Sequence, residues 1–295
     1  MDIKVNNINI HYEVLGKGEP IILLNPNSVN TNAMKYIAKR LADSFEVYIF
    51  DRRCCGKSER NCTLSYEESA KDVYEFIKTL KLNKPYLLGC SGGATVAMNV
   101  AINYPDSIGK LILCSGVART GIIKKPLYAK IMEKIPYPGK KNNEMFEKLN
   151  YEASTLTEED LSKINIPTLV VNGGRKDIVP INEAEYINKS IKSSKLLILE
   201  KEGHFSYMIN CRWYYKLLDF LSNDKVNDGN IHQYLKPCQD YLLSIYPILD
   251  IFQNENVITS EKAFRDKLGI FVSFMGYEKP VVAPDDALEI INKNI

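Results

Sequence analysis

The stretch LLGCSGG, residues 87–93, places two nucleophilic side chains, Cys90 and Ser91, next to each other between glycines. Gly89 and Gly93 stand two positions before and after Ser91, which fits the pattern G-x-S-x-G of a nucleophile elbow. Such an elbow is a sharp, strained turn between a strand and a helix, so its flanking positions must lack bulky side chains. The stretch therefore predicts nucleophilic chemistry.

The glycine register decides between the two nucleophiles. An elbow centred on Cys90 would need glycine at position 88, where the chain has Leu88. An elbow centred on Ser91 has glycine at both required positions. We therefore predict that Ser91 attacks the substrate and that Cys90 packs in the turn as a small apolar residue.

A serine nucleophile needs a base, and the base needs an acidic group that orients it. His204 lies in LEKEGHFSYM, directly after an apolar strand-like run, and Asp177 lies in GGRKDIVP after another such run. An isolated histidine is more often a residue at a helix start, and an isolated aspartate is usually an ordinary turn residue. Their order after Ser91 is nucleophile, acid, histidine, which favours a catalytic triad.

Strand-like and helix-like segments alternate along most of the chain, which predicts an α/β fold with a mostly parallel sheet and helices on both faces. Short apolar runs indicate buried strands, and an alternating segment at the start indicates an edge strand. The predicted strands are residues 8–14, 21–25, 45–51, 85–90, 110–116, 168–173 and 195–200. The predicted helices are residues 32–43, 64–80, 92–104, 181–192 and 205–222. Ser65 and Glu68 have the spacing of a capping box for the second helix.

Taken together, these motifs resemble the α/β-hydrolase fold superfamily, in its serine-nucleophile, esterase-like branch, over residues 1–224. GCSGG resembles the elbow, GGRKDIVP the loop of the triad acid and EGHFSYM the histidine loop. DRRCCGKSE, residues 51–59, resembles the Asp-x-Arg-Gly-x-Gly-x-Ser loop of the family, with Cys54 where glycine is usual. The resemblance implies an α/β-hydrolase fold with the triad Ser91, Asp177 and His204.

The resemblance also implies an oxyanion hole formed by the backbone amides of Gly92 and Asn27. Members usually carry His-Gly after the strand that corresponds to residues 21–25, whereas this chain has Asn25, Pro26, Asn27 and Ser28. Pro26 lacks an N–H but precedes the expected donor, so the donor is retained. The side chain of Asn27 or Ser28 could also line the substrate pocket.

Two segments extend this expected domain. Residues 115–156 are the expected cap over the active site, with apolar side chains and an excess of lysine and arginine. That charge could attract an anionic acyl substrate or a membrane surface, or it could simply face water. Residues 225–295 are expected to form a C-terminal helical appendage. Its amphipathic helices must pack on the core, the cap or a second copy, and a homodimer is the favoured case.

Composition excludes several other classes. The 295 residues carry a net charge of +2, which does not indicate binding to nucleic acid. No apolar run is long enough to span a membrane, and the start of the chain lacks a signal-peptide pattern. Seven cysteines without framework spacing are typical of a reducing compartment, so we expect a cytoplasmic protein. No metal site and no organic cofactor are predicted.

The sequence therefore predicts a serine hydrolase that cleaves an ester, or a related activated acyl bond of a small molecule, through an acyl-enzyme. The same triad supports other reactions, namely hydrolysis of a C–C bond, aminopeptidase-like cleavage and a lyase reaction. A protein that binds a ligand, turns over slowly and acts as a sensor is a further alternative. The rate of turnover on a simple ester separates an enzyme from such a sensor.

Overall fold

The computed structural model describes residues 1–123, 145–146, 148–151, 155–174, 177–200, 203–204 and 211–221. The chain divides into two compact units, residues 1–204 and 205–295, and each is described by itself. The expected appendage, residues 225–295, and the boundary at residue 224 lie outside the described residues. Most of the expected cap, residues 115–156, also lies outside them.

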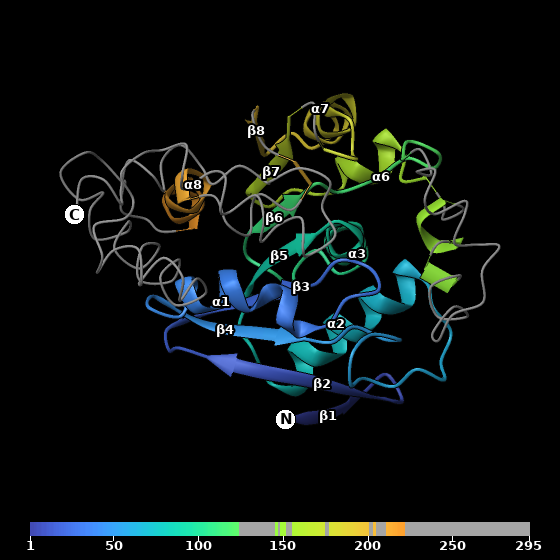
Figure 1. Cartoon of the computed structure of the whole chain (residues 1–295), viewed down its shortest axis with the longest axis vertical. Helices are drawn as coiled ribbons and strands as arrows, with labels where there is room; N and C mark the ends of the chain where they lie inside the picture. Colours follow the sequence, from blue (N-terminus) through green and yellow to red (C-terminus); the bar gives the residue numbers. More distant parts are fainter. Residues whose placement is uncertain are drawn as a thin grey trace, which may run out of the picture. The chain divides into compact units, whose positions relative to one another are not determined.

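An eight-stranded sheet forms the centre of the first unit (Figure 1). The strands are β1 (Asp2–Val5), β2 (Ile8–Leu15), β3 (Glu19–Leu24), β4 (Phe45–Phe50), β5 (Tyr86–Cys90), β6 (Leu111–Cys114), β7 (Thr168–Gly173) and β8 (Ser194–Leu199). Their order across the sheet is β1-β2-β4-β3-β5-β6-β7-β8. The chain builds outward from β3 in both directions, so the strand order reverses between β3 and β5. Such a reversal leaves a crevice beyond the carboxyl ends of the strands, where ligands bind in open α/β sheets.

Six neighbouring strands, from β4 to β8, run parallel, and β1 and β2 are antiparallel to their neighbours. All residues of β5, β6 and β7 are buried, as are the last four of β3. Continuous apolar runs form such strands because helices cover both faces of a parallel sheet. The mostly parallel sheet is as predicted.

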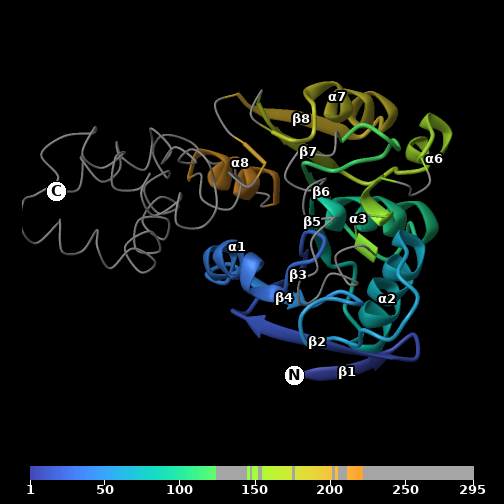
Figure 2. The same ribbon diagram turned by 45° about the vertical axis from the view of Figure 1, so that its right-hand side comes forward.

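The helices of the first unit cover the sheet in two layers. They are α1 (Lys35–Leu41), α2 (Tyr66–Thr79), α3 (Gly92–Asn103), α6 (Glu158–Ser162) and α7 (Ile181–Ser190), and a 3₁₀ turn, η1 (Thr31–Met34), precedes α1. Figure 2 shows α1 on one face of the sheet and α2 and α3 on the other. Helix α3 packs against α2, α6 and the central strands, so the helix that follows Ser91 is held on several sides.

Two details of the predicted elements need correction. Residues 8–14 are not the edge strand, because β1 pairs outside β2 through a two-residue turn at Asn6 and Asn7. Both asparagines have positive φ, 45° and 63°, as a type I′ hairpin turn requires. The capping box of α2 is only half formed. Ser65 accepts a hydrogen bond from the Glu68 amide, but the Glu68 carboxylate binds Asn6 and Arg53 instead.

The second unit contributes one described helix, α8 (Cys211–Leu221). Trp213, Tyr214, Leu217, Leu218 and Leu221 are buried. The predicted helix over 205–222 begins in residues that lie outside the described part of the chain. Within the described residues, none of the helices is both long and apolar enough to cross a bilayer.

Candidate active site

Ser91 lies at the turn between β5 and α3, with φ 53° and ψ −122°. This conformation is strained for any residue other than glycine and turns the serine out of both elements. A Cβ atom on Gly89 would lie 2.3 Å from the Gly93 carbonyl oxygen, and one on Gly93 would lie 2.4 Å from the Leu24 carbonyl oxygen. Both glycines are therefore required for steric reasons, as the motif predicts.

His204 connects Ser91 to Asp177 by two hydrogen bonds. Its Nδ1 atom lies 2.7 Å from Oδ1 of Asp177, and its Nε2 atom lies 3.1 Å from Oγ of Ser91. The three residues follow β5, β7 and β8, whose parallel carboxyl ends lie at one edge of the sheet. This arrangement can move a proton from the serine hydroxyl to the imidazole.

The Asp177 carboxylate is fully buried and accepts four hydrogen bonds. Oδ1 accepts from His204 and from the Val179 amide, and Oδ2 accepts from the Ser115 hydroxyl and the Gly173 amide, all at 2.6–2.9 Å. Burial alone would raise the pKa of Asp177, but the bonds from His204, Ser115 and Val179 outweigh it and lower the pKa below its ordinary value. An ionised Asp177 keeps the Nδ1 proton on His204, which leaves Nε2 free to accept a proton from Ser91.

The second part of the site lies in the loops after β3 and β4. The Asn27 side chain packs directly over Gly92, because a Cβ atom on Gly92 would lie 2.1 Å from Asn27 Oδ1. Asn27 Nδ2 donates to the Tyr66 hydroxyl at 3.1 Å and to Asn150 Oδ1 at 2.5 Å. Asn27 Oδ1 accepts from Nη2 of Arg52 at 2.7 Å. The structure thus brings Asn27 next to Gly92, and the side-chain amide of Asn27 is held by hydrogen bonds to Tyr66, Asn150 and Arg52.

Comparisons with known proteins agree with this architecture. A family model described as "alpha/beta hydrolase fold" matches residues 20–145. The chain has the α/β-hydrolase fold. It is 25% identical over 232 residues to the human protein "Serine hydrolase BPHL", a match that covers 68% of this chain and 79% of that protein.

Solved structures of several hydrolases superpose on the chain. The enol-lactonase from Burkholderia xenovorans LB400 has a TM-score of 0.64 and 20% identity, and the match covers 75% of this chain and 99% of that one. The meta-cleavage product hydrolase CumD from Pseudomonas fluorescens IP01 has a TM-score of 0.63 and 18% identity, covering 75% and 97%. At these identities the likeness is one of fold.

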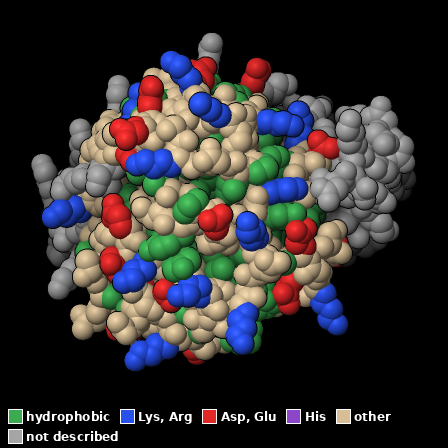
Figure 3. Space-filling model, turned by 180° about the vertical axis from the view of Figure 1, so that it is seen from behind, with side chains coloured by type: hydrophobic (Ala, Val, Ile, Leu, Met, Phe, Trp, Pro, Cys, Tyr) green, Lys and Arg blue, Asp and Glu red, His purple; other side chains and the backbone are tan. Residues whose placement is uncertain are grey.

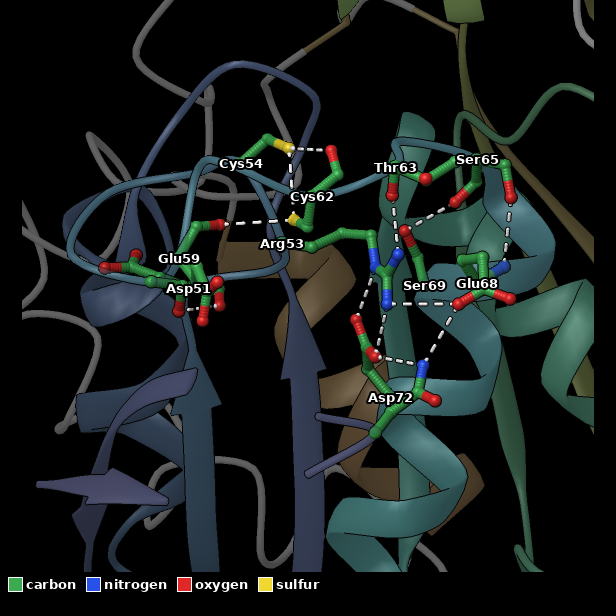
Figure 4. Close-up of polar contacts among 12 residues, drawn as sticks. Asp51, Arg53, Cys54, Glu59, Cys62, Thr63, Ser65, Glu68, Ser69 and Asp72 are labelled. Carbon is green, nitrogen blue, oxygen red and sulfur yellow. Dashed lines mark hydrogen bonds and ion pairs between the residues drawn. The ribbon is translucent and has the colours of Figure 1, made fainter. Parts of the chain in front are cut away.

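The loop after β4 departs from the usual α/β-hydrolase motif but is firmly anchored. Figure 4 shows Arg53 directed at helix α2, where its Nε and Nη2 atoms donate to the Asp72 carboxylate, each at 2.7 Å. Glu68 lies 3.3 Å from Nη2. Cys54, at the usual glycine position, has φ 63°, a left-handed conformation that glycine adopts without strain.

Of the cysteines described near the site, Cys54, Cys55, Cys90 and Cys114 are buried, and Cys62 is partly buried. Cys90 lies on β5 opposite Cys114 on β6, and both are fully buried. Cys54 lies 3.6 Å from Cys62, measured between the sulfur atoms. Burial, with the contact to Cys62, raises the pKa of Cys54 to about 12, so this thiol is protonated near neutral pH. A protonated thiol is a poor nucleophile.

Sequence reasoning brought forward five site residues, and the structure brings Ser91, Asp177 and His204 together and Asn27 next to Gly92. The sequence reasoning missed four polar neighbours of these residues: Ser115, Arg52, Tyr66 and Asn150. Ser115 directly follows β6, which ends at Cys114, but the predicted strand over 110–116 included it. With the correct strand end, the rule that polar groups collect after parallel strands could have found it. Tyr66 and Asn150 approach Asn27 from distant parts of the chain and carry no local signal.

The described surface gives few signs of other ligands. On the face in Figure 3, the basic and acidic side chains that are described lie interspersed rather than separated by sign. Within the described ranges, no group of three histidine, cysteine, aspartate or glutamate side chains has the geometry to hold a metal ion.

Proposed function

We propose that this protein is a serine hydrolase that cleaves an ester, or a related activated acyl bond of a small molecule, through an acyl-enzyme on Ser91. The observation that carries the proposal is the pair of hydrogen bonds that join Asp177 to His204 and His204 to Ser91, at 2.7 and 3.1 Å. The strained turn at Ser91 adds to it, because that turn places the hydroxyl at the amino end of α3.

Acylation begins when Ser91 Oγ bonds to the substrate carbonyl carbon and its proton passes to His204 Nε2. Asp177, ionised because of its lowered pKa, stabilises the imidazolium that forms. The carbonyl oxygen becomes an oxyanion, and the backbone amides of Gly92 and Asn27 are the proposed donors to it. The bond to the leaving group then breaks, and the leaving group takes the proton from Nε2.

Deacylation repeats these steps with water as the nucleophile. Water gives a proton to Nε2 and attacks the acyl carbon, and Ser91 regains the proton as the acid product leaves. No metal or organic cofactor takes part in this scheme. The named activities of two relatives, a serine hydrolase and an enol-lactonase, support hydrolysis of an ester-type bond.

A substrate panel tests the proposal. p-Nitrophenyl esters of increasing acyl length are assayed beside amino-acid p-nitroanilides, with Ser91→Ala as the background. The proposal expects turnover of at least one ester well above that background. Turnover only of the anilides would favour aminopeptidase-like cleavage. Release of about one p-nitrophenol per protein, with no further turnover, would favour the slow ligand-binding sensor.

If no compound in the panel is turned over, hydrolysis of a C–C bond or a lyase reaction becomes the better hypothesis. Both reactions use the same three side chains on a different substrate. The meta-cleavage product hydrolase among the similar structures indicates which kind of compound to assay next, namely a meta-cleavage product.

We also propose that the protein forms a homodimer through residues 225–295 and is located in the cytoplasm. Light scattering on the full chain and on a chain that ends at Asp224 tests the dimer. The proposal expects dimer mass only for the full chain. A monomer in both cases would assign the segment to another role.

A further inference from the structure

Two adjacent arginines after β4 differ in how their charge is neutralised. Arg52 and Arg53 are almost fully buried, with 1% and 2% of their surface exposed. Arg53 is paired with Asp72 and lies near Glu68, as Figure 4 shows. Arg52 makes no ion pair with any carboxylate in the described part of the chain. The adjacent Asp51 carboxylate instead accepts from the backbone amides of Thr31 and Lys57, at 2.6 and 2.8 Å.

Within the described residues, the hydrogen bonds of the Arg52 side chain go to the loop after β3. Its Nε donates to the carbonyl oxygen of Asn25 at 3.0 Å and to the Asn25 side chain at 3.3 Å. Its Nη2 donates to Asn27 Oδ1 at 2.7 Å. Its Nη1 is buried and has no partner. A buried guanidinium with an unpaired Nη1 group, and with no counterion among the described residues, is costly to keep unless it serves a purpose.

This positive charge lies close to the proposed oxyanion hole. Arg52 binds the side-chain amide of Asn27, which packs directly against Gly92. The backbone amides of Gly92 and Asn27 are the proposed donors to the oxyanion. Only one side chain therefore separates the guanidinium from the place where negative charge develops. Inside a protein the attraction between such charges is stronger than in water.

We propose that Arg52 is a positioning residue for the acyl-transfer step. It fixes the Asn25–Asn27 loop so that the backbone amide of Asn27 faces the reacting carbonyl. Its unneutralised charge favours the oxyanion over the neutral substrate. The tetrahedral intermediate supplies the negative charge that Arg52 does not meet among the described residues of the resting protein. This inference rests on the proposed serine hydrolase function.

The decisive variants remove or neutralise the charge. Arg52→Met removes it with little change in volume, Arg52→Lys keeps it without the forked geometry, and Asn27→Asp neutralises it with a nearly isosteric carboxylate. We expect kcat on a p-nitrophenyl ester to fall roughly 10- to 100-fold in Arg52→Met and Asn27→Asp, with KM changed less than about threefold. Arg52→Lys should retain more activity than Arg52→Met.

A transition-state analogue gives a readout that a purely structural role would not change. An alkyl trifluoromethyl ketone adds to the serine as an anionic tetrahedral adduct, so its inhibition constant should rise by about the same factor as kcat falls. Arg53→Lys is the matched control, since Arg53 is equally buried but paired. It should lower the melting temperature and leave kcat within about threefold of the wild type.

Several outcomes would overturn the inference. They are an unchanged kcat in folded Arg52→Met and Asn27→Asp, a change in KM alone, or equal losses in Arg52→Lys and Arg52→Met with unchanged binding of the ketone. Should Arg52→Met fail to fold, Asn27→Asp carries the test, because it adds an ion pair to Arg52. Wild-type protein without ester turnover would instead contradict the proposed function.

Discussion

The loops at the carboxyl edge of the sheet form two groups that are held in different ways. On the Ser91 side, the loops after β5, β6, β7 and β8 bring four side chains into direct contact, and Asp177 ends as an ionised acceptor with four donors. On the Asn27 side, the loops after β3 and β4 surround the buried Arg52 guanidinium, which has no carboxylate partner among the described residues. The charge of Asp177 is stabilised by donors in the resting protein. In the proposed mechanism, the charge of Arg52 is balanced only when the oxyanion forms.

The difference indicates a division of labour. In the proposed mechanism, the side chains on the Ser91 side make and break the covalent bond, so a substitution there should remove nearly all activity. The Asn27 side acts on the charge of the intermediate, so a substitution there should weaken activity by a smaller factor. The following substitutions test this ranking.

Ser91→Ala should have the largest effect. Without its nucleophile the enzyme should lose kcat by a factor on the order of 10⁴–10⁶, because no acyl-enzyme can form. Steady-state ester hydrolysis measures the loss, and circular dichroism checks that the variant is folded. Residual activity above about one-tenth of the wild type would show that another group attacks the substrate.

His204→Ala should be nearly as damaging, with a loss on the order of 10³–10⁵. His11→Ala is the control, since His11 also bonds to an aspartate, Asp2, but on β1 and β2. His232→Ala should likewise be close to normal. Activity of His204→Ala close to that of the wild type would contradict the proposed base.

The juxtaposition of Ser91, Asp177 and His204 could be predicted from sequence because each residue has a local signal. Ser91 has its glycines, and Asp177 and His204 each follow an apolar strand whose carboxyl end must lie at the shared edge of a parallel sheet. The Asn27 side could not be predicted in the same way. Its hydrogen bonds join residues that are 25, 39 and 123 positions apart, and packing alone decides them. Strand β1 was missed because four residues show too little periodicity, and its Asn-Asn turn was not recognised.

Asn27→Ala should have an intermediate effect. It keeps the proposed backbone donor but removes three hydrogen bonds that hold the loop, so kcat should fall roughly 10- to 100-fold. Comparison with Ser91→Ala on the same ester measures the contrast between the two sides. Equal losses in both variants would contradict the division of labour.

Ser115→Ala should reduce kcat by roughly tenfold, because it removes one charge-assisted donor to Asp177. The pKa of Asp177 lies below its ordinary value. The ionised carboxylate therefore stabilises the fold fully at a pH above the ordinary pKa, and this stabilisation is lost as the pH falls through the lowered pKa. Removing a donor raises that pKa, so thermal melts between pH 3 and pH 6 should show the variant losing stability at a higher pH. Melts that superpose would remove Ser115 from the account.

Cys90→Ala should have the smallest effect, with kcat within about threefold of the wild type. Its thiol is fully buried on β5, and the loss should be one of packing rather than of chemistry. A matched assay of Cys90→Ser and treatment of the wild type with a thiol reagent complete the test. Inactivation comparable to that of Ser91→Ala would reverse the glycine-register argument.

The central claim, an acyl-enzyme on Ser91, is tested most directly by trapping that intermediate. Protein mixed with p-nitrophenyl acetate is quenched in acid within the first turnover, digested and analysed by mass spectrometry. The account predicts a burst of about one p-nitrophenol per active site and one acetyl group on the peptide that contains Ser91, with neither in Ser91→Ala. An acetyl group on Cys90, or rapid turnover with no covalent intermediate and an unaffected Ser91→Ala variant, would contradict it.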